Sequence, residues 1–534
     1  MIEAFWIPLL PPYLIGLVLS FAVEALLTPR PVAPWRRPMA AVGVHVGVWT
    51  LAFALELMLF RRPYFAVANV LAIELLIVLV SNAKFKALKE PFVYPDFEYF
   101  LDAVKHPRLY LPFFGVGKAV AAGGGYGLAL WAGLALEDSL TAGAGVWLVS
   151  YAELPQEGMF DPTALTAQFY FHSASLALIG WISLAFGGRH YSAALDAVED
   201  LRRLGLLAAI WAYRLSERRP VNQLRQEAPF LAMRPPASLS SRLSDLVVIQ
   251  SESFFDVRRL YPAEVRQDVL ANFDLLKAEA AQYGRLQVEA FGANTVRTEF
   301  GFLTGVPVQK LGIHRYNPYR KLAMETFPSL ASYLKSIGYR TICVHPYHRS
   351  FYRRHKVLPN LGFDEFIDID AFHGAQREGA YVGDQALGEM VRNLLERSTD
   401  APLFIHVITM ENHGPLHWES VGAEDVENAL LCKSPPDCND LVAYVRHLRN
   451  ADAMFGSMRR FLLDGERATT LCVFGDHVPI MPKVYQQLGE SDGTTDYVIW
   501  RSTGEGASVQ HDQGVTELAL AVLGVLDLHG GKYQ

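Results

Sequence analysis

Cysteine is scarce in this chain, with four residues in 534. Cys343 and Cys472 lie in strand-like apolar runs, where a thiol behaves as a small buried hydrophobe. Cys432 and Cys438 flank a short loop, and either a disulfide or two free thiols is compatible with their spacing. No cysteine has a partner histidine at zinc-site spacing, so the sequence excludes a cysteine-based structural zinc site.

Charge is also scarce, and basic charge does not dominate. Charged residues make up 19% of the chain, and the formal net charge is −7. Nucleic-acid binding proteins carry a basic patch or stripe, so this composition argues against a nucleic-acid partner. Hydrophobic residues make up 51%, and their excess lies before residue 190.

Five long apolar segments account for that excess. Each is close to the ~20 residues that a helix needs to cross a bilayer. They cover residues 5–23, 39–60, 63–82, 119–136 and 169–188. The alternative, a set of buried helices in a soluble protein, does not account for five such segments in 190 residues. The first segment has no basic stretch before it and no small-residue cleavage site, so we do not expect a cleaved signal peptide.

The orientation of these spans is ambiguous by sequence. Basic residues follow the first span (Arg30, Arg36, Arg37), the second (Arg61, Arg62) and the third (Lys84, Lys86, Lys89), whereas residues 137–168 contain none. The positive-inside rule then places the first and third loops, and with five spans the carboxyl-terminal half, in the cytoplasm. A sixth crossing within residues 140–154 would place that half outside.

The remaining chain divides into a connector and a second domain. We predict a transmembrane domain over residues 1–190, a juxtamembrane connector over 191–244 and a catalytic domain over 245–534. Within the connector, residues 194–215 predict one amphipathic helix at the membrane surface. Residues 225–242 are rich in proline and serine and predict an extended linker.

The sequence pattern of the second domain is typical of an α/β fold. Short apolar runs at 246–250, 341–345, 403–409 and 470–474 predict strands, and the alternation at 286–290 predicts another. Helical patterns at 327–340 and 441–463 lie between them. Strands that alternate with helices indicate a mostly parallel sheet with both faces covered.

Polar side chains follow four of these strands where each strand ends. Glu252 follows the first, His345 the second, His413 the third, and Asp476 and His477 the fourth. Sites in open α/β sheets lie beyond the carboxyl ends of the strands. Carboxylates and an imidazole suit a divalent ion of the Mn, Mg or Zn kind, so Glu252, Asp476 and His477 are the candidate ligands.

The stretch GANTVRTEFGFLTG, residues 292–305, supplies a hydroxyl. Thr295 follows a flexible turn, and metal coordination is one way to make a threonine hydroxyl nucleophilic. The alternative is that Thr295 is only a helix N-cap, with Thr298 and Glu299 in the first turn. Position in the sequence alone does not separate these two interpretations.

Four motifs in this order resemble the lipoteichoic acid synthase and phosphoglycerol transferase family of the alkaline phosphatase/sulfatase superfamily. They are VVIQSESFFD (247–256), GANTVRTEFGFLTG (292–305), TMENHGP (409–415) and FGDHVP (474–479). The resemblance covers roughly residues 240–500, and five amino-terminal spans are typical of the family. It implies a helical transmembrane domain of about five spans followed by an α/β sulfatase-like catalytic domain.

The resemblance also implies roles for single residues. Glu252, Thr295, Asp476 and His477 fall on the metal positions, and Thr295 on the nucleophile. His413 and His345 fall among the substrate-binding positions. The segment SFYRRH (350–355) resembles an aromatic-plus-arginine segment, which implies Tyr352 and Arg354 for substrate contacts, with Arg353 as the alternative to Arg354.

The implied activity is a metal-dependent phosphotransfer. Glycerol phosphate would move from phosphatidylglycerol to a glycan or lipid-linked acceptor through a phospho-threonine, with one divalent ion, Mn²⁺ or else Mg²⁺ or Zn²⁺. The family places its catalytic domain outside the cytoplasm, and we adopt that orientation over the one from the basic loops. The partners are then the bilayer, the phospholipid donor and the acceptor.

Three other functions share some features with this sequence, and one observation argues against each of them. A phosphoethanolamine transferase shares the superfamily, the membrane anchor and a threonine nucleophile, but usually carries several disulfides. A sulfatase needs a C/S-x-P-x-R motif for its formylglycine, and the chain has none. A non-enzymatic membrane sensor would not need Glu252, Thr295, Asp476 and His477 to be intact.

Overall fold

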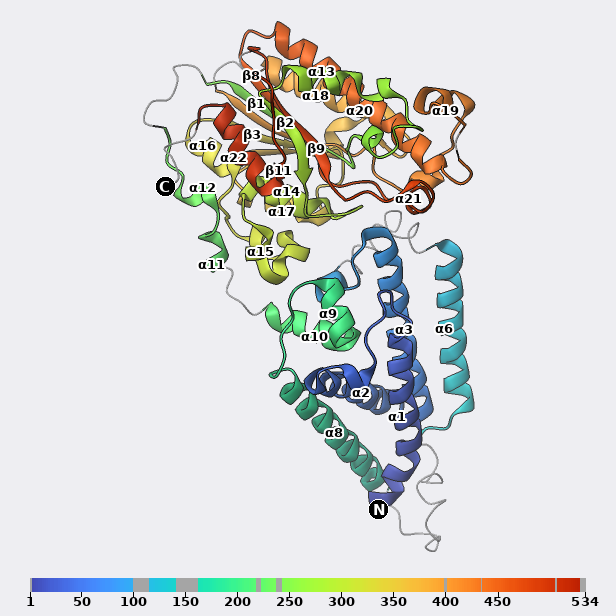
Figure 1. Ribbon diagram of the computed structural model, residues 1–534. Helices are drawn as coiled ribbons and strands as arrows, with labels where there is room; N and C mark the ends of the chain where they lie inside the picture. Colours follow the sequence, from blue (N-terminus) through green and yellow to red (C-terminus); the bar gives the residue numbers. More distant parts are fainter. Residues whose placement is uncertain are drawn as a thin grey trace, which may run out of the picture. The chain divides into compact units, whose positions relative to one another are not determined.

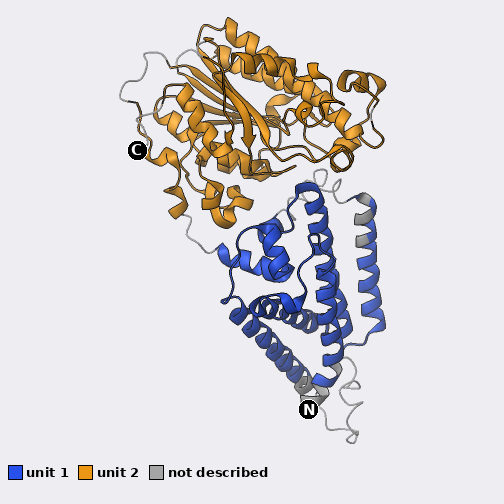
Figure 2. Cartoon of the chain, in the orientation of Figure 1, with its two compact units in different colours: residues 1–218 blue, residues 219–534 orange. Residues whose placement is uncertain are grey.

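The computed structural model describes residues 2–98, 115–140, 162–217, 222–236, 243–397, 401–433, 435–504 and 507–528. The chain forms two compact units, residues 1–218 and 219–534 (Figure 2). The division falls inside the segment 191–244 that the sequence predicts as a connector. Figure 1 shows an all-helical first unit and a second unit built on one large sheet.

Helices form at all five apolar segments of the first unit. They are α1 (Ile2–Glu24), α2 (Met39–Phe60), α3 (Pro63–Leu88), α6 (Val116–Leu136) and α8 (Pro162–Gly187). Among the described residues, α2, α3 and residues Thr166–Gly187 of α8 are long and apolar enough to cross a membrane. The predicted total of five spans stays a prediction, and the sixth crossing considered at 140–154 falls almost entirely outside the described residues.

Helices α2 and α8 pack closely because small residues line their contact. A Cβ added to Gly47 would lie 2.6 Å from the backbone nitrogen of Leu184 and 2.8 Å from the carbonyl oxygen of Gly180. The hydroxyl of Ser183 also donates to the carbonyl oxygen of Gly43, at 2.8 Å. Membrane helices usually associate through small residues, which let two backbones approach, and through interhelical hydrogen bonds.

The single amphipathic helix predicted at 194–215 is wrong. The structure has two helices, α9 (Ala197–Leu204) and α10 (Leu206–Ser216), with Gly205 between them at φ +83°. A Cβ at Gly205 would overlap Arg37 and Glu24, and the Glu24 carboxylate accepts the backbone N–H of Leu207 at 3.1 Å. The packing of α1 against this turn therefore breaks the helix, and a membrane-surface location stays a prediction.

The extended linker predicted at 225–242 is also partly wrong. Two short helices, α11 (Asn222–Arg225) and α12 (Pro229–Ala232), precede residues 233–236. Ala228 and Phe230 are buried in the core of the second unit, and the Phe230 ring lies 6.4 Å from that of Tyr333. These apolar contacts tie the beginning of the segment to the second unit.

The second unit is built on a nine-stranded sheet in the order β10-β2-β9-β8-β1-β7-β3-β4, with β11 also paired to β2. Strands β8, β1, β7, β3 and β4 run parallel, and β9 is antiparallel to β8 and β2. The strands are β1 (Asp245–Ser251), β2 (Gln282–Gln287), β3 (Arg340–Val344), β4 (Glu365–Ile367), β7 (Leu403–Ile408), β8 (Thr469–Gly475), β9 (Thr495–Arg501), β10 (Val509–Gln510) and β11 (Gln513–Gly514). A separate hairpin joins β5 (Arg377–Glu378) to β6 (Tyr381–Val382).

Helices cover both faces of this sheet (Figure 1). Alternate residues of β1 face opposite cores: Val247 and Ile249 one core, Leu246 and Val248 the other. The first core includes residues of α13 (Ala271–Glu279), α18 (Asp384–Arg397) and α20 (Asn439–Asp464). The second includes residues of α14 (Thr295–Thr304), α16 (Leu330–Ser336), α17 (Arg354–Asn360) and α22 (Val515–Val525). The remaining helices, α15 (Val308–Leu311), α19 (Ala423–Ala429) and α21 (Pro482–Leu488), are short.

The predicted fold class is confirmed: apolar helices precede a mixed α/β sulfatase-like domain. Four of the predicted strands form as β1, β3, β7 and β8. The strand expected at 286–290 is displaced, because β2 runs from Gln282 to Gln287 in register with β9. Residues after 287 leave the sheet and turn through Gly292, at φ +72°, toward α14.

Candidate active site

Two neighbouring parallel strands bring the candidate metal ligands together. β1 and β8 are paired so that Ser251 lies opposite Gly475, and the next residues are Glu252 and Asp476. His477 Nε2 lies 3.5 Å from Glu252 Oε1 and 3.5 Å from Asp476 Oδ2. One ligand atom from each of the three lies within 4.8 Å of the others.

The groups around this cluster hold its side chains in place. Ser253, at φ +55°, donates its backbone N–H to Asp476 Oδ1 at 2.8 Å and its hydroxyl to Glu252 Oε1 at 2.9 Å. The backbone N–H of Glu252 donates to the Thr409 hydroxyl at 2.9 Å. These hydrogen bonds orient the two carboxylates, as hydrogen bonds to metal ligands usually do.

The cluster has the properties of a cation site. Glu252, Asp476 and His477 are all buried, and among the described residues Asp476 Oδ2 accepts no hydrogen bond. Burial and the adjacent Asp476 carboxylate raise the pKa of Glu252 to about 8. Two buried carboxylates this close repel each other, and a divalent cation between them would remove that repulsion. The residues present therefore fit a divalent metal.

Thr295 lies at the first position of α14, one residue after the helix cap. The N-cap is Asn294, in the left-handed region at φ +68°, so the alternative interpretation of Thr295 as the cap is not what the structure shows. Thr295 is largely buried, and its hydroxyl makes no hydrogen bond with the described residues. One turn later, the Thr298 hydroxyl donates to the carbonyl oxygen of Asp476 at 2.7 Å. Residues three apart share one face of a helix, so Thr295 lies on the face that contacts Asp476.

Arg354 is buried and held by an ion pair. Its Nη2 and Nε lie 2.7 and 3.3 Å from the two carboxylate oxygens of Glu299. Its Nη1 lies 3.1 Å from Nε2 of His345. The other ring nitrogen of His345 lies 3.0 Å from the carbonyl oxygen of Ile408, so Nδ1 donates there and Nε2 accepts from Arg354. The Arg354 charge opposes the rise in the pKa of Glu252.

The segment before α17 is bent sharply. Tyr352 and Arg353 both have positive φ, at +50° and +55°, a conformation that costs free energy for residues other than glycine. The Cζ atom of Arg354 lies 5.3 Å from the centre of the Tyr352 ring. Arg353 is exposed whereas Arg354 is buried, so the structure brings Arg354, rather than Arg353, next to His345.

His413 lies in the loop after β7. Burial lowers the pKa of His413, and the hydrogen bond of Nδ1 to the Gly414 carbonyl oxygen, at 2.8 Å, and the Asp476 carboxylate oppose that shift. Its Nδ1 is 3.3 Å from the hydroxyl of Tyr381, and the two rings meet edge to face at 5.5 Å. Tyr381 comes from β6, and the sequence carries no signal for it because it belongs to none of the recognised motifs.

A buried network supports the His413 loop, and sequence reasoning missed its role. The two carboxylate oxygens of Glu411 accept from the backbone N–H of Asp384 at 2.7 Å and contact Nδ1 of His447 at 2.8 Å. His447 Nε2 lies 2.8 Å from Glu419. Burial opposes a charge on His447, but hydrogen bonds to Glu411 and Glu419 prevail and raise its pKa to about 9. Glu411 is thus engaged with α18 and α20.

Two further features lie apart from this cluster. All four cysteines are free thiols, so the structure has no Cys432–Cys438 disulfide.

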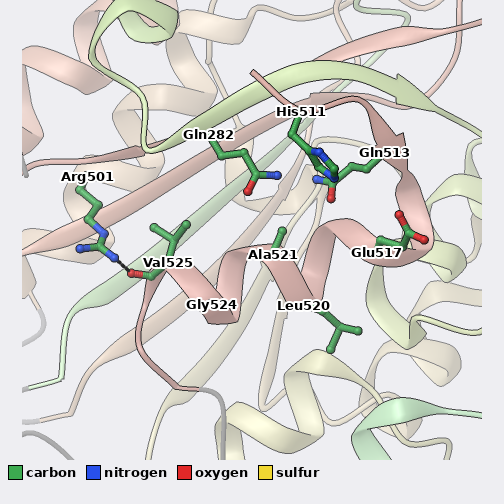
Figure 3. Close-up of a pocket in the computed structure, with 9 residues that line it drawn as sticks. All are labelled: Gln282, Arg501, His511, Gln513, Glu517, Leu520, Ala521, Gly524 and Val525. Carbon is green, nitrogen blue, oxygen red and sulfur yellow. Dashed lines mark hydrogen bonds between the residues drawn. The ribbon is translucent and has the colours of Figure 1, made fainter. Parts of the chain in front are cut away.

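A surface hollow of about 490 Å³ is lined by residues of β2, β9, β11 and α22 with His511 (Figure 3). It contains none of the site residues predicted from the sequence.

Comparisons with known proteins agree with this arrangement. Residues 244–528 match the sulfatase family. The chain is 27% identical over 488 residues to the capsular polysaccharide biosynthesis protein RkpI of Rhizobium meliloti, covering 85% of this chain and 80% of the relative. It is 23% identical over 207 residues to lipoteichoic acid synthase 1 of Bacillus subtilis, covering 35% of this chain and 31% of that one.

A solved structure resembles the chain over most of its length. The lipooligosaccharide phosphoethanolamine transferase A (EptA) of Neisseria meningitidis matches with a TM-score of 0.50 and 11% identity, covering 90% of this chain and 88% of that one. At this identity the likeness concerns the fold alone. The resemblance to lipoteichoic acid synthases found in the motifs is confirmed, and the chain belongs to the sulfatase family, as a multi-pass membrane member of the alkaline phosphatase superfamily.

Proposed function

We propose that this protein is a membrane-bound phosphoglycerol transferase. It moves glycerol phosphate from phosphatidylglycerol to a glycan or lipid-linked acceptor, with Thr295 as the nucleophile. Glu252, Asp476, His477 and Thr295 would hold one divalent ion. Mn²⁺ is our first choice, and Mg²⁺ and Zn²⁺ are the alternatives, because carboxylates with imidazole accept all three. When bound, the ion lowers the pKa of the threonine hydroxyl and neutralises charge on the phosphoryl oxygens.

This proposal rests on a contrast between two threonines on one helix. Thr298 donates its hydroxyl to the backbone of Asp476, whereas the Thr295 hydroxyl, on the same face and nearer the helix N-terminus, has no partner among the described residues. The N-terminus of α14 carries partial positive charge, which favours a phosphate there. A free hydroxyl beside a cation-binding cluster is the arrangement that a nucleophile needs.

The first step exchanges one ester bond for another. Thr295 Oγ1 attacks the donor phosphorus, the bond from phosphorus to the diacylglycerol oxygen breaks, and that oxygen leaves as an alcohol with the proton that the threonine hydroxyl gives up. A glycerophospho-threonine remains. We assign Arg354, with Tyr352 against it and His345 beside it, to the phosphoryl oxygens, because a guanidinium aimed there stabilises the developing charge.

The second step reverses the first with another alcohol. The acceptor hydroxyl attacks the phosphorus, the bond to Thr295 Oγ1 breaks, and the threonine regains its proton. We assign His413 to the glycerol phosphate group. The name of RkpI concerns capsular polysaccharide, which supports a glycan acceptor. A lipid donor in the outer leaflet requires the catalytic unit to face away from the cytoplasm, and we propose that orientation.

Phosphoethanolamine transfer is the second candidate. It is suggested by the fold shared with EptA, an integral membrane protein named as a phosphoethanolamine transferase. The absence of disulfides among the four cysteines favours phosphoglycerol transfer, because phosphoethanolamine transferases of this kind usually carry several.

Lipid turnover separates the two candidates. The full chain, reconstituted with Mn²⁺ in vesicles of phosphatidylglycerol and phosphatidylethanolamine, is supplied with an oligosaccharide acceptor. We expect diacylglycerol to accumulate at the expense of phosphatidylglycerol, and not in the Thr295→Ala variant. Loss of phosphatidylethanolamine instead would replace the proposal with the second candidate.

A further inference from the structure

Glu299 has no role in the chemistry described above, although it is a fully buried carboxylate one turn after Thr295. Both of its oxygens contact Arg354, at 3.3 and 2.7 Å, and the Tyr319 hydroxyl donates to one of them. A buried ion pair adds little net stability, because desolvation of the two charges offsets their attraction. Fold stability alone therefore does not account for this pair.

The hydrogen-bond inventory of Arg354 shows what the pair achieves. A guanidinium has five N–H groups. Nε and one N–H of Nη2 go to Glu299, and one N–H of Nη1 goes to His345. One N–H on Nη1 and one on Nη2 make no hydrogen bond with the residues that the structure describes. Nη1 and Nη2 are adjacent nitrogens, and N–H groups on both can bind phosphate oxygens in bidentate fashion.

We propose that Glu299 is a positioning residue that holds Arg354 so that its two remaining N–H groups meet the phosphoryl group of the donor. The inference rests on the proposed function and deepens it. Residues four apart lie on one face of a helix. One helix, α14, therefore carries both the nucleophile Thr295 and the carboxylate that fixes the guanidinium, which sets the spacing between attacking oxygen and phosphate-binding group.

His345 also holds Arg354 in position. Both of its ring nitrogens are engaged, one with the Ile408 carbonyl oxygen and one with Arg354. The neutral ring thus accepts from the arginine and has no N–H left for a substrate. Its contribution to substrate binding passes through Arg354.

The test measures ligand binding by the purified full chain with Mn²⁺, using titration calorimetry. The probes are glycerol 1-phosphate, O-phosphoethanolamine and inorganic phosphate, which share the phosphoryl group. We expect Glu299→Gln and Arg354→Gln each to weaken binding at least tenfold, and the double variant to bind no more weakly than Arg354→Gln alone. Glu365→Gln is the control, because Glu365 forms an exposed ion pair with Arg340 at 2.6 Å, and its affinity should not change.

Wild-type affinity in a folded Glu299→Gln protein would overturn the inference, as would additive losses in the double variant. If Glu299→Gln does not fold, Glu299→Asp keeps the charge but withdraws it by one methylene. We expect it to weaken binding severalfold, and unchanged affinity would again refute positioning. Wild-type protein that binds O-phosphoethanolamine but not glycerol 1-phosphate would refute the proposed donor. The affinity of the Glu299 variants is then measured with O-phosphoethanolamine, so the role of Glu299 is still tested. Binding of none of the three probes would refute the inference.

Discussion

The hydroxyl of Thr298 donates a hydrogen bond of 2.7 Å to the carbonyl oxygen of Asp476 and so joins the first turn of α14 to the end of β8. This contact commits one of two threonines to structure. It leaves Thr295, one turn nearer the helix N-terminus on the same face, as the hydroxyl available for chemistry.

The first prediction separates the two threonines. Thr295→Ala should abolish transfer with the fold retained, because the attacking oxygen is lost. Thr298→Ala should cost about 1 kcal/mol of stability, as typical for one hydrogen bond, and retain part of the activity. With donor and no acceptor, mass spectrometry of the wild type should find glycerophosphate on the peptide at Thr295. An adduct on Thr298, or a tenth of wild-type rate in folded Thr295→Ala, would contradict the assignment.

The second prediction concerns the metal. Glu252→Ala and His477→Ala should each remove the bound ion, because either change deletes one of the four proposed protein ligands. Elemental analysis of the purified variants measures this directly. Glu365→Ala, an exposed acid on β4, is the matched control and should keep a full complement of metal. Unchanged metal content in both ligand variants would exclude the site.

The third prediction concerns pH and His447. Its pKa is raised from 6.5 to about 9 in the folded protein, so its charge stabilises the fold. The contribution is complete below about pH 6.5 and is lost as pH rises through about 9, and it amounts to roughly 3 kcal/mol at 1.36 kcal/mol per pKa unit. His447→Gln should flatten the fall in thermal midpoint of the full chain between these pH values.

The control for that experiment is His373→Gln, because His373 is exposed. This variant should reproduce the pH profile of the wild type. A His447→Gln protein with the same slope as the wild type would show that the imidazole does not carry the charge assigned to it.

The fourth prediction tests the helix contact in the first unit. Gly47→Ala should destabilise the protein by roughly 1–3 kcal/mol, the usual cost of overpacking, because the new Cβ meets the backbone of α8. Gly43→Ala should be tolerated, since its nearest neighbour, the Ser183 hydroxyl, is 3.8 Å from the added Cβ. Thermal midpoints in detergent compare the two, and equal midpoints would contradict the packing.

The fifth prediction concerns orientation. Residues 245–534 should lie outside the cytoplasmic membrane, where the proposed lipid donor and acceptor meet. A carboxyl-terminal fusion to a reporter that is active only outside the cytoplasm should show activity. Activity from a reporter that works only in the cytoplasm would reverse the orientation and support the distribution of basic loops instead.

Local patterns in the sequence were sufficient for much of the architecture. Helices form at all five apolar segments, and β1, β3, β7 and β8 appear within a residue of the predicted runs. Hydrophobic length and periodicity are local properties, so they are readable without the fold. The Glu252, Asp476 and His477 cluster followed from the same source, because the carboxyl ends of parallel strands meet at one edge of a sheet.

Contacts between distant residues decided the rest. The break at Gly205 depends on Glu24 and Arg37, and pairing with β9 and β11 determines which residues form β2. Pairing of Glu299 with Arg354, across 55 positions, and of Glu411 with His447 has no local signal. The sequence by itself therefore determined the apolar helices, the four parallel strands β1, β3, β7 and β8, and the polar residues that follow them. Only the tertiary structure decided which buried charges meet, because pairing of buried charges depends on packing between elements far apart in the chain.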